Sequence, residues 1–381
     1  MDLKPTAAHA DFRQEVRTWL SENKPPLPLP PAGSSAGVPA HLAWEKKLFD
    51  AGLAVVSWPQ QFGGRNLDLW YWLIFEEEYF RAGLPQRLGQ NGIFLLAPSI
   101  LEFGTEDQQN RFLRRMAAVE DVWCQGWSEP EAGSDLAAIR SRAERDGNGR
   151  GWRLFGQKCW TTRAAFSSHM FGIFRTGEPN ERHRGLTYFL IDLDQPGVVV
   201  RPVGTFDGEN GFADVYFDGA FVSDSDVLGG VGNGWKVAMA TTGSERSLSL
   251  RSPGRFLATV DRLIAMFCTA PDSVRQDTRH RHSVTDAWMA AQAYKLATDW
   301  TVTRLLEGAT LGAEASLSKV FWSELDIQLH QAALAIQGTD ADLDDEWTNG
   351  FEFALAGPIY AGTNQIQRNI IAERLLGLPR I

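Results

Sequence analysis

The apolar residues of this 381-residue chain recur with two different periods, and the change of period constrains the fold more than any other feature. Over the first 121 residues, apolar side chains recur every three or four positions, which predicts amphipathic helices. Beyond that point the period falls to two, in short runs rich in β-branched and aromatic residues. Helical spacing then returns. The order predicts an α+β, multidomain chain with a helical N-terminal domain (1–121), a central β domain (122–226) and a C-terminal helical domain (227–381).

The N-terminal segment predicts several helices and one long loop. A helix is expected over residues 11–24, which contain neither Gly nor Pro, and a surface loop over the proline-rich residues 25–39. Thr105 and Gln108 have the spacing of a capping box at the start of a further helix. We interpret the acidic run 76–78 as one solvated helix face with a single residue turned inward.

The central and C-terminal segments predict two different kinds of packing. The central segment has about 100 residues of short alternating runs separated by Gly-rich turns, in the size range of a small antiparallel sandwich or barrel. After Gly234, the helical stretches are long enough to pack as a bundle.

Composition excludes several classes of protein. The formal charge is −10, from 37 basic and 47 acidic side chains, and no long basic stripe is present, so a nucleic-acid partner is not expected. No uninterrupted apolar run reaches the roughly 18 residues of a membrane span, and the N-terminal residues resemble neither a signal nor a transit peptide. A cytoplasmic chain without a membrane segment is expected. The three cysteines lack C-x-x-C spacing, which predicts buried thiols and no metal site.

Four short motifs could carry chemistry, and each has a structural alternative. The segment 125–135 combines hydroxyls with small residues where a strand ends, as either a ligand loop or a surface turn does. Residues 160–162 place an indole beside two hydroxyls, which fits stacking on a flat ligand or ordinary strand alternation. Residues 360–364 form a small-residue turn before a helix and could bind an anion or only cap the helix. Glu245 beside Arg246 is either a desolvated base or a salt-bridge partner.

Taken together in this order, the motifs resemble the acyl-CoA dehydrogenase family. The resemblance covers nearly the whole chain, and it rests on four segments: SEPEAGSD at 128–135, GQKCWTT at 156–162, GNGWK at 232–236 and the C-terminal YAGTNQIQRNIIAERLLGLPR. It implies a helical N-terminal domain, a central antiparallel β domain and a C-terminal four-helix bundle, with FAD bound between the domains.

The resemblance also implies roles for individual residues. Ser128 would hold the pyrimidine edge of the flavin, Thr162 would bond near flavin N5 and Trp160 would flank the ring. The whole set that it assigns to the cofactor is Gln125, Trp127, Ser128, Trp160, Thr161, Thr162, Thr363 and Gln365. The set that it assigns to the acyl-CoA substrate is Ser134, Arg246 and Gly362, with Arg246 near the CoA phosphates.

The catalytic base is where this chain departs from most of the family. Many members carry a glutamate immediately before the Gly-Thr of the last motif, but this chain has Ala361, which offers no proton acceptor. A smaller branch carries the base on the helix after the β domain, directly before an arginine, and Glu245 directly precedes Arg246. The resemblance therefore implies that Glu245 is the base and that the backbone N–H of Ala361 bonds the thioester oxygen.

The implied reaction removes two hydrogens from an acyl-CoA. Glu245 would take the α proton while the β hydride passes to flavin N5, giving a trans-2-enoyl thioester; an electron-transferring flavoprotein would reoxidise the cofactor. An α proton beside a thioester is only weakly acidic, so the site has to exclude water and stabilise the enolate. Because Ala361 leaves space where a glutamate would lie, a bulky, branched or polycyclic acyl group is our hypothesis.

Two further departures concern assembly. The Arg-x-x-Phe-Gly stretch that grips FAD across a subunit interface in the family is not evident in residues 275–288, and Thr339 replaces the second glycine of an expected Gly-Gly turn. Either a homotetramer or a heterotetramer with a related chain is therefore expected. His280 and His282 are interpreted as solvated loop residues. Two other functions stay open: a non-catalytic or co-catalytic subunit, and a flavin oxidase or monooxygenase on the same fold.

Overall fold

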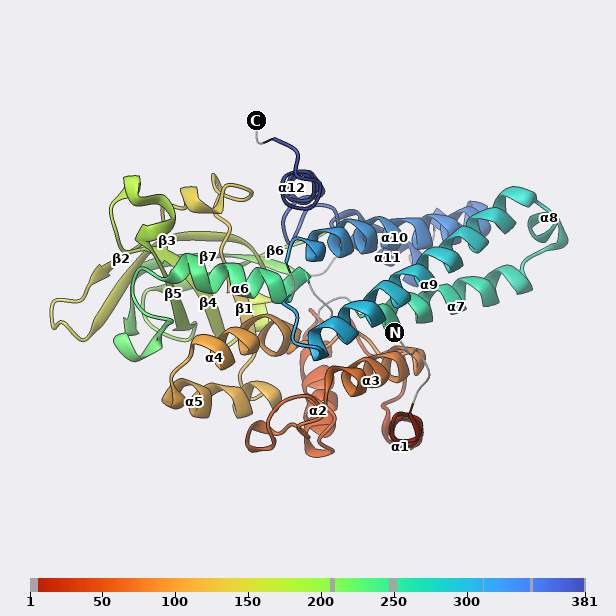
Figure 1. Ribbon diagram of the computed structural model, residues 1–381, viewed down its shortest axis with the longest axis horizontal. Coiled ribbons are helices and arrows are strands. Elements are labelled where there is room, and N and C mark those ends of the chain that lie inside the picture. Colours follow the sequence, from red (N-terminus) through yellow and green to blue (C-terminus); the bar gives the residue numbers. More distant parts are fainter. Residues whose placement is uncertain (1–5, 206–209, 247–251, 311, 343–344, 380–381) are drawn as a thin grey trace. The chain divides into compact units, whose positions relative to one another are not determined.

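The computed structural model describes residues 6–205, 210–246, 252–310, 312–342 and 345–379 (Figure 1). By packing, the chain divides into two compact units, which are described separately. The helical unit comprises Met1–Leu27, Leu67–Pro85 and Glu245–Ile381, and the sheet unit comprises Pro28–Asn66 and Gln86–Ser244. Because these units group segments by packing and not by order along the chain, the three domain boundaries expected from the sequence stay a prediction.

The helical unit is built around three long helices that run side by side (Figure 1). Its helices and helical turns are α1 (Ala7–Asn23), α3 (Leu69–Arg81), α7 (Pro253–Thr269), α8 (Asp272–Arg275), α9 (Thr278–Leu306), α10 (Glu314–Gln337), η7 (Gly338–Asp342), α11 (Glu346–Leu355), α12 (Asn364–Ile370) and η8 (Ile371–Leu375). Buried apolar side chains of α7, α9, α10 and α11 form one core, which includes Phe256, Tyr294 and Trp322. The predicted C-terminal bundle is thus present, and at Gly254 an added Cβ would lie 2.8 Å from the backbone of Glu76 in α3.

Helix α1 confirms the predicted N-terminal helix, but the acidic run in α3 corrects our interpretation. Glu76, Glu77 and Glu78 are only 3%, 8% and 3% exposed, so they do not form a solvated face. Glu78 accepts hydrogen bonds from Arg13 and Arg17 of α1, at 2.8 Å and 2.9 Å, because the two helices pack together. The partners lie about 60 positions away, and charge spacing within α3 gives no sign of them.

The sheet unit contains one eight-stranded sheet. Its strands are β1 (Trp123–Gly126), β2 (Arg142–Arg145), β3 (Gly151–Thr162), β4 (His169–Arg175), β5 (Leu186–Asp192), β6 (Val198–Val203), β7 (Phe212–Ser223) and β8 (Val227–Leu228). The strand order is β6-β7-β3-β2-β4-β5-β8, and β1 pairs with β4. Most pairings are antiparallel as expected; β4 is parallel to both β1 and β2. The predicted central β segment is therefore confirmed, with a mixed sheet.

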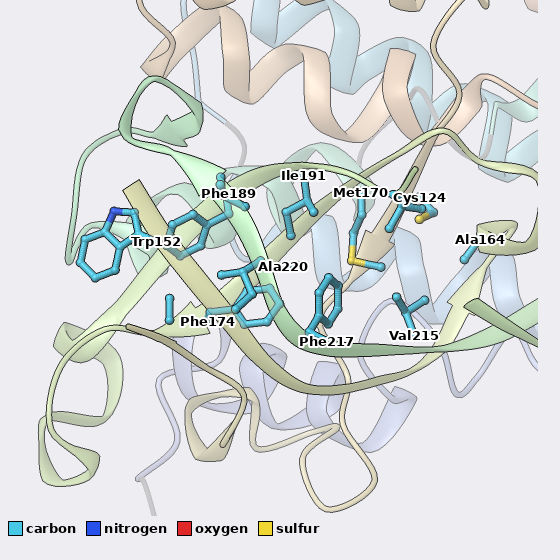
Figure 2. Packing of buried hydrophobic residues seen from close by; sticks show 14 of the residues in the cluster. Cys124, Trp152, Ala164, Met170, Phe174, Phe189, Ile191, Val215, Phe217 and Ala220 are labelled. Carbon is cyan, nitrogen blue, oxygen red and sulfur yellow. The ribbon is translucent and has the colours of Figure 1, made fainter. Parts of the chain in front are cut away.

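Alternate side chains of these strands form the core of the sheet unit. Trp152, Phe174 and Phe189 pack edge to face, with ring centroids about 6.0 Å apart for each neighbouring pair (Figure 2). Phe174 also meets Phe217 of β7 at 5.2 Å. The period of two seen in the sequence thus corresponds to one buried face on β7 and on most of β3, whereas β4 and β5 are buried on both faces.

Short helices complete the sheet unit. They are α2 (Gly37–Asp50), α4 (Ala97–Phe103), α5 (Glu106–Ala117) and α6 (Gly234–Arg246), with helical turns η1 (Gln60–Phe62), η2 (Asn91–Leu96), η3 (Leu136–Ala138), η4 (Ala164–Phe166), η5 (Pro179–Gly185) and η6 (Asp224–Asp226). The last two residues of α6, Glu245 and Arg246, belong to the helical unit. The capping box of Thr105 and Gln108 is confirmed at the start of α5. Helix α2 begins at Gly37 and includes Pro39, because proline is tolerated in a first helical turn, so the loop is shorter than predicted.

Three further expectations can be compared with the structure. Cys124 and Cys159 are buried, but Cys268 is exposed near the end of α7, so the prediction of three buried thiols is wrong there. His280 and His282 lie in the first turns of α9 and not in a loop. Within the described ranges, no helix is both long and apolar enough to cross a membrane.

Candidate functional site

The loop after β1 is held in place by a buried carboxylate. Glu129 accepts hydrogen bonds from the backbone amides of Arg140, at 2.6 Å, and Ser141, at 3.0 Å. Its Oε1 also lies 2.7 Å from the ammonium of Lys158 on β3. Burial acts to raise the pKa of the Glu129 carboxyl, but the charge of Lys158 and the hydrogen bonds lower that pKa below its ordinary value. The loop therefore carries a fixed, ionised anchor one residue after Ser128.

The loop after β1 and the end of β3 are joined directly. The amide of Cys159 donates to the Ser128 carbonyl at 2.9 Å. Between Lys158 and Thr161 the pairing of β3 with β7 shifts, and Trp160 takes the left-handed φ of 54°. This irregularity leaves the Trp160 indole 67% exposed, with one edge near Phe212. A large ring exposed to this extent is a flat apolar surface available to a ligand.

The two joined segments carry polar atoms without partners among the described residues. The hydroxyls of Ser128 and Thr162 belong to half-buried residues, and neither has a hydrogen-bond partner within the described part of the chain. Thr161 is fully buried, and its Oγ1 likewise has no partner among the described residues, nor does Nε1 of buried Trp127. A buried polar group without a partner costs about 1–3 kcal/mol, so such atoms point to a missing ligand or water.

The other expected residues of the sheet unit are more loosely placed. Gln125 is half-buried on β1, opposite Phe171 of β4. Ser134 is exposed, and the next residue, Asp135, is bonded to Arg182 of η5 at 2.9 Å. The structure thus brings Gln125, Trp127, Ser128 and residues 160–162 into one region and puts Ser134 in the exposed middle of the same loop.

The last motif forms a tight turn in the helical unit. Ala361 and Gly362 have φ values of 57° and 79°, and Thr363 caps α12 by accepting from the amide of Ile366. The side chain of Gln367 donates to the carbonyls of Ala361 and Gly362, at 3.4 Å each. Positive φ is uncommon for a residue other than glycine, so these contacts hold a strained turn in place.

The side chains around this turn differ in exposure. Gln365 is exposed, whereas its neighbour Asn364 is buried and accepts from the buried ammonium of Lys319 at 2.8 Å.

Glu245 and Arg246 are the last two residues of α6, but their side chains lie outside the described residues. Thr339 lies in η7, after Gly338 at a φ of 61°.

Two anchors were missed from the sequence although both lie in quoted motifs. Glu129 belongs to SEPEAGSD and Lys158 to GQKCWTT, but the resemblance assigned roles only to other residues of these two motifs. The available signal was a lysine inside an alternating strand, with a glutamate in the loop that packs on it. Among the described residues, no cluster of His, Cys, Asp or Glu could hold a metal ion.

Comparison with known proteins decides the family. The sequence matches three family models: "Acyl-CoA dehydrogenase, N-terminal domain" over residues 6–120, "middle domain" over 124–220 and "C-terminal domain" over 232–376. The chain belongs to the acyl-CoA dehydrogenase family. It is 38% identical to acyl-CoA dehydrogenase IpdE1 of Mycobacterium tuberculosis, in an alignment that covers 97% of this chain and 98% of that protein.

Solved acyl-CoA dehydrogenases share the fold. The ChsE4-ChsE5 complex from Mycobacterium tuberculosis contains a chain that is 25% identical, with a TM-score of 0.83 and full coverage of both chains. A protein described as the Tcur3481-Tcur3483 steroid ACAD has a TM-score of 0.86 at 23% identity, again over both full chains. At that level of identity, the second likeness concerns the fold alone.

Family membership makes this chain an oxidoreductase of the acyl-CoA dehydrogenase type with FAD as its cofactor. The described residues fit that cofactor. Strand β3 carries the exposed Trp160 indole together with Thr161 and Thr162, and the Ser128 loop is bonded to the same strand. A flat ring system with a polar edge needs this combination of an apolar face and hydrogen-bonding groups.

Proposed function

We propose that this chain catalyses the α,β-dehydrogenation of an acyl-CoA thioester to the trans-2-enoyl-CoA, with Glu245 as the base that takes the α proton. The observation that carries the proposal is that position 361 holds an alanine while position 245 holds a glutamate. Ala361 occupies a strained turn and cannot accept a proton, while Glu245 lies in the last turn of α6, the helix that follows the sheet. One carboxylate is absent from its usual place, and another is present where a branch of the family carries it.

The chemistry requires a base in a dry environment and a group that stabilises the enolate. Excluding water raises the pKa of a carboxyl group and brings it closer to the pKa of the α carbon. The backbone N–H of Ala361 is the proposed donor to the thioester oxygen, a role that needs no side chain. Bound FAD would accept the β hydrogen together with its electron pair.

The remaining residues are assigned either to the FAD cofactor or to the acyl-CoA substrate. On the cofactor we place Gln125, Trp127, Ser128, Trp160, Thr161, Thr162, Thr363 and Gln365. Trp160 would stack on the ring, because its indole is exposed, and the hydroxyls of Ser128 and Thr162 would bond its polar edge. On the substrate we place Ser134, Arg246 and Gly362.

The proposed acyl group is bulky, branched or polycyclic. A methyl side chain at 361 occupies less space than a glutamate would, and an apolar pocket discriminates by about 1–3 kcal/mol per methylene.

We also propose that the working assembly is a tetramer, either of this chain alone or with a related chain. Large apolar side chains are exposed on α9 and α10, as expected of an interface that a partner covers. They are Trp288, Met289, Leu296, Trp300, Leu317 and Phe321. The ChsE4-ChsE5 complex supports the heteromeric arrangement. An electron-transferring flavoprotein is the proposed acceptor.

The test is a Glu245→Gln variant in rapid, oxygen-free mixing with a panel of straight-chain and steroid-derived acyl-CoAs. Loss of a general base typically costs about 10²–10⁴-fold, so bleaching of the flavin absorbance should slow by that factor. Glu352→Gln, at an exposed position on α11, is the matched control and should react as the wild type does. Rapid bleaching by Glu245→Gln would refute the assignment of the base.

One alternative has specific support. A co-catalytic subunit would explain the similarity to a chain of a two-component complex. In that case the purified chain would be colourless and would gain flavin only when a partner chain is added. Formation of hydrogen peroxide during turnover would instead identify an oxidase.

A further inference from the structure

Lys158 is fully buried in the sheet unit, and its ammonium reaches three segments. Nζ lies 2.7 Å from Oε1 of Glu129, 2.8 Å from the carbonyl of Ile173 on β4 and 3.4 Å from the carbonyl of Trp127, the first residue after β1. An ammonium has three N–H donors, so each of them has an acceptor. Nζ also lies 4.7 Å from the centre of the Phe174 ring. The side chain therefore ties β3 to β4 and to the start of the loop after β1.

Glu129 extends this connection to a third place in the chain. Its carboxylate bonds the amides of Arg140 and Ser141, the two residues that precede β2, in addition to Lys158. A single buried ion pair thus fixes both ends of the loop that contains Ser128 and Ser134. Directly beside the pair, the Cys159 amide bonds the Ser128 carbonyl.

Stability alone does not account for a pair of this kind. Buried ion pairs are often matched or exceeded in stability by apolar side chains of similar volume, because removing two charges from water is costly. Burial lowers the pKa of Lys158, and the nearby charge of Glu129 acts in the opposite direction. Apolar replacements cannot reproduce directional bonds to two amides and two carbonyls.

We infer that Glu129 and Lys158 are positioning residues for the cofactor: they lock the loop after β1 against β3, so that the Ser128 hydroxyl and the Trp160–Thr162 segment meet the same flavin. Neither residue needs to touch the cofactor, because each lies one or two positions from a residue that is proposed to do so. The inference rests on the proposed roles of Ser128, Trp160 and Thr162.

The test uses the full-length protein with FAD as the probe. In the double variant Glu129→Gln/Lys158→Met both charges are removed together, so no unpaired charge is left in the core and the melting temperature of the FAD-free protein should stay close to that of the wild type. Its dissociation constant for FAD should rise by at least about tenfold, which corresponds to about 1.4 kcal/mol, and the visible spectrum of the bound flavin should shift. The single variant Lys158→Met leaves an unpaired buried carboxylate and should lower the melting temperature as well.

The matched control is another ion pair of the sheet unit. Arg115 holds Asp121 with two hydrogen bonds of 2.8 Å, before β1 and away from both motifs. Arg115→Met/Asp121→Asn should leave FAD affinity and the flavin spectrum unchanged. Wild-type FAD affinity and spectrum in the Glu129/Lys158 double variant would overturn the inference, and so would an equal loss in the control.

The outcome is independent of the catalytic base. FAD titration reads cofactor binding only, whereas the Glu245→Gln experiment reads proton removal from the substrate. Retained FAD affinity in the double variant, with normal dehydrogenation by the wild type, would overturn the positioning role alone. Failure of the wild type to bind FAD would overturn both the positioning role and the cofactor assignments on which it rests.

Discussion

Replacing Glu78 with glutamine is expected to loosen helix α1 from α3. The Glu78 carboxylate accepts from Arg13 and Arg17 of α1 and from Arg81 of its own helix, at 2.8 to 3.0 Å. Glutamine keeps one carbonyl oxygen but loses the charge, and it turns an NH₂ group toward guanidinium donors. Three of these four bonds connect the helices, so their loss falls on the docking of α1.

The size of the effect follows from how exposed each arginine is. A hydrogen bond to a charged group contributes about 1.5–3 kcal/mol when shielded from water, and Arg13 is the most shielded partner at 27% exposure. Arg17 and Arg81 are about half exposed, which reduces each of their contributions to about 0.5 kcal/mol. The expected loss of free energy is about 2.5 kcal/mol, or roughly 60-fold in an opening equilibrium.

Hydrogen exchange of the α1 amides measures this opening directly, because local opening sets their protection. Protection of the α1 amides should fall by about 60-fold in Glu78→Gln. It should stay unchanged in Glu22→Gln, which changes an exposed position of α1 itself. Burial acts to raise the pKa of the Glu78 carboxyl, but the arginines lower that pKa overall. The carboxylate therefore contributes its full stabilisation of α1 docking at a pH above the ordinary carboxyl range, and this stabilisation is lost as the pH falls through the lowered pKa. Wild-type α1 should therefore lose protection on acidification, and the variant much less. A decrease in protection of less than about threefold at neutral pH would refute the reasoning.

Two further predictions concern the sheet unit and the thiols. Gly156→Ala should destabilise the protein by about 1–3 kcal/mol in thermal unfolding, because the new Cβ would lie 2.3 Å from Oγ of Ser141 and the backbone φ of residue 156 is 130°. Gly147→Ala is the control: its new Cβ would meet no atom within 4 Å, so it should have little effect. A thiol-specific disulfide reagent should modify one cysteine in the folded protein, Cys268, because burial raises the pKa of Cys124 to about 12; modification of more than one thiol before unfolding would contradict this.

Local patterns in the sequence predicted most of the elements. The helix over 11–24, the capping box at Thr105 and the alternating strands all depend on neighbours within a few residues, and the structure confirms them. Features that depend on distant partners were missed. The acidic run 76–78 is buried because arginines of another helix neutralise it, and a spacing rule within one helix cannot show that.

The candidate site shows the same division. Its motifs could be located from the amino-acid sequence, and the family resemblance implied roles for the residues that would contact ligands. The supporting contacts were not visible, because Glu129 and Lys158 lie 29 positions apart and their pairing depends on how β1, β3 and β4 meet. The exposure of Trp160 was likewise hidden, since a strand residue at a φ of 54° is not predicted by alternation.

The turn at Ala361 finally bears on where the base can lie. A non-glycine residue in the left-handed region costs about 1–2 kcal/mol, so the turn keeps its shape only because its surroundings hold it. The contacts that hold it include the Thr363 cap and the Gln367 side chain, and neither of these two involves the side chain of residue 361. The turn therefore forms with alanine at 361, so the proposed backbone donor and the proposed base can be supplied by separate parts of the chain. This separation is what an assignment of the base to Glu245 requires.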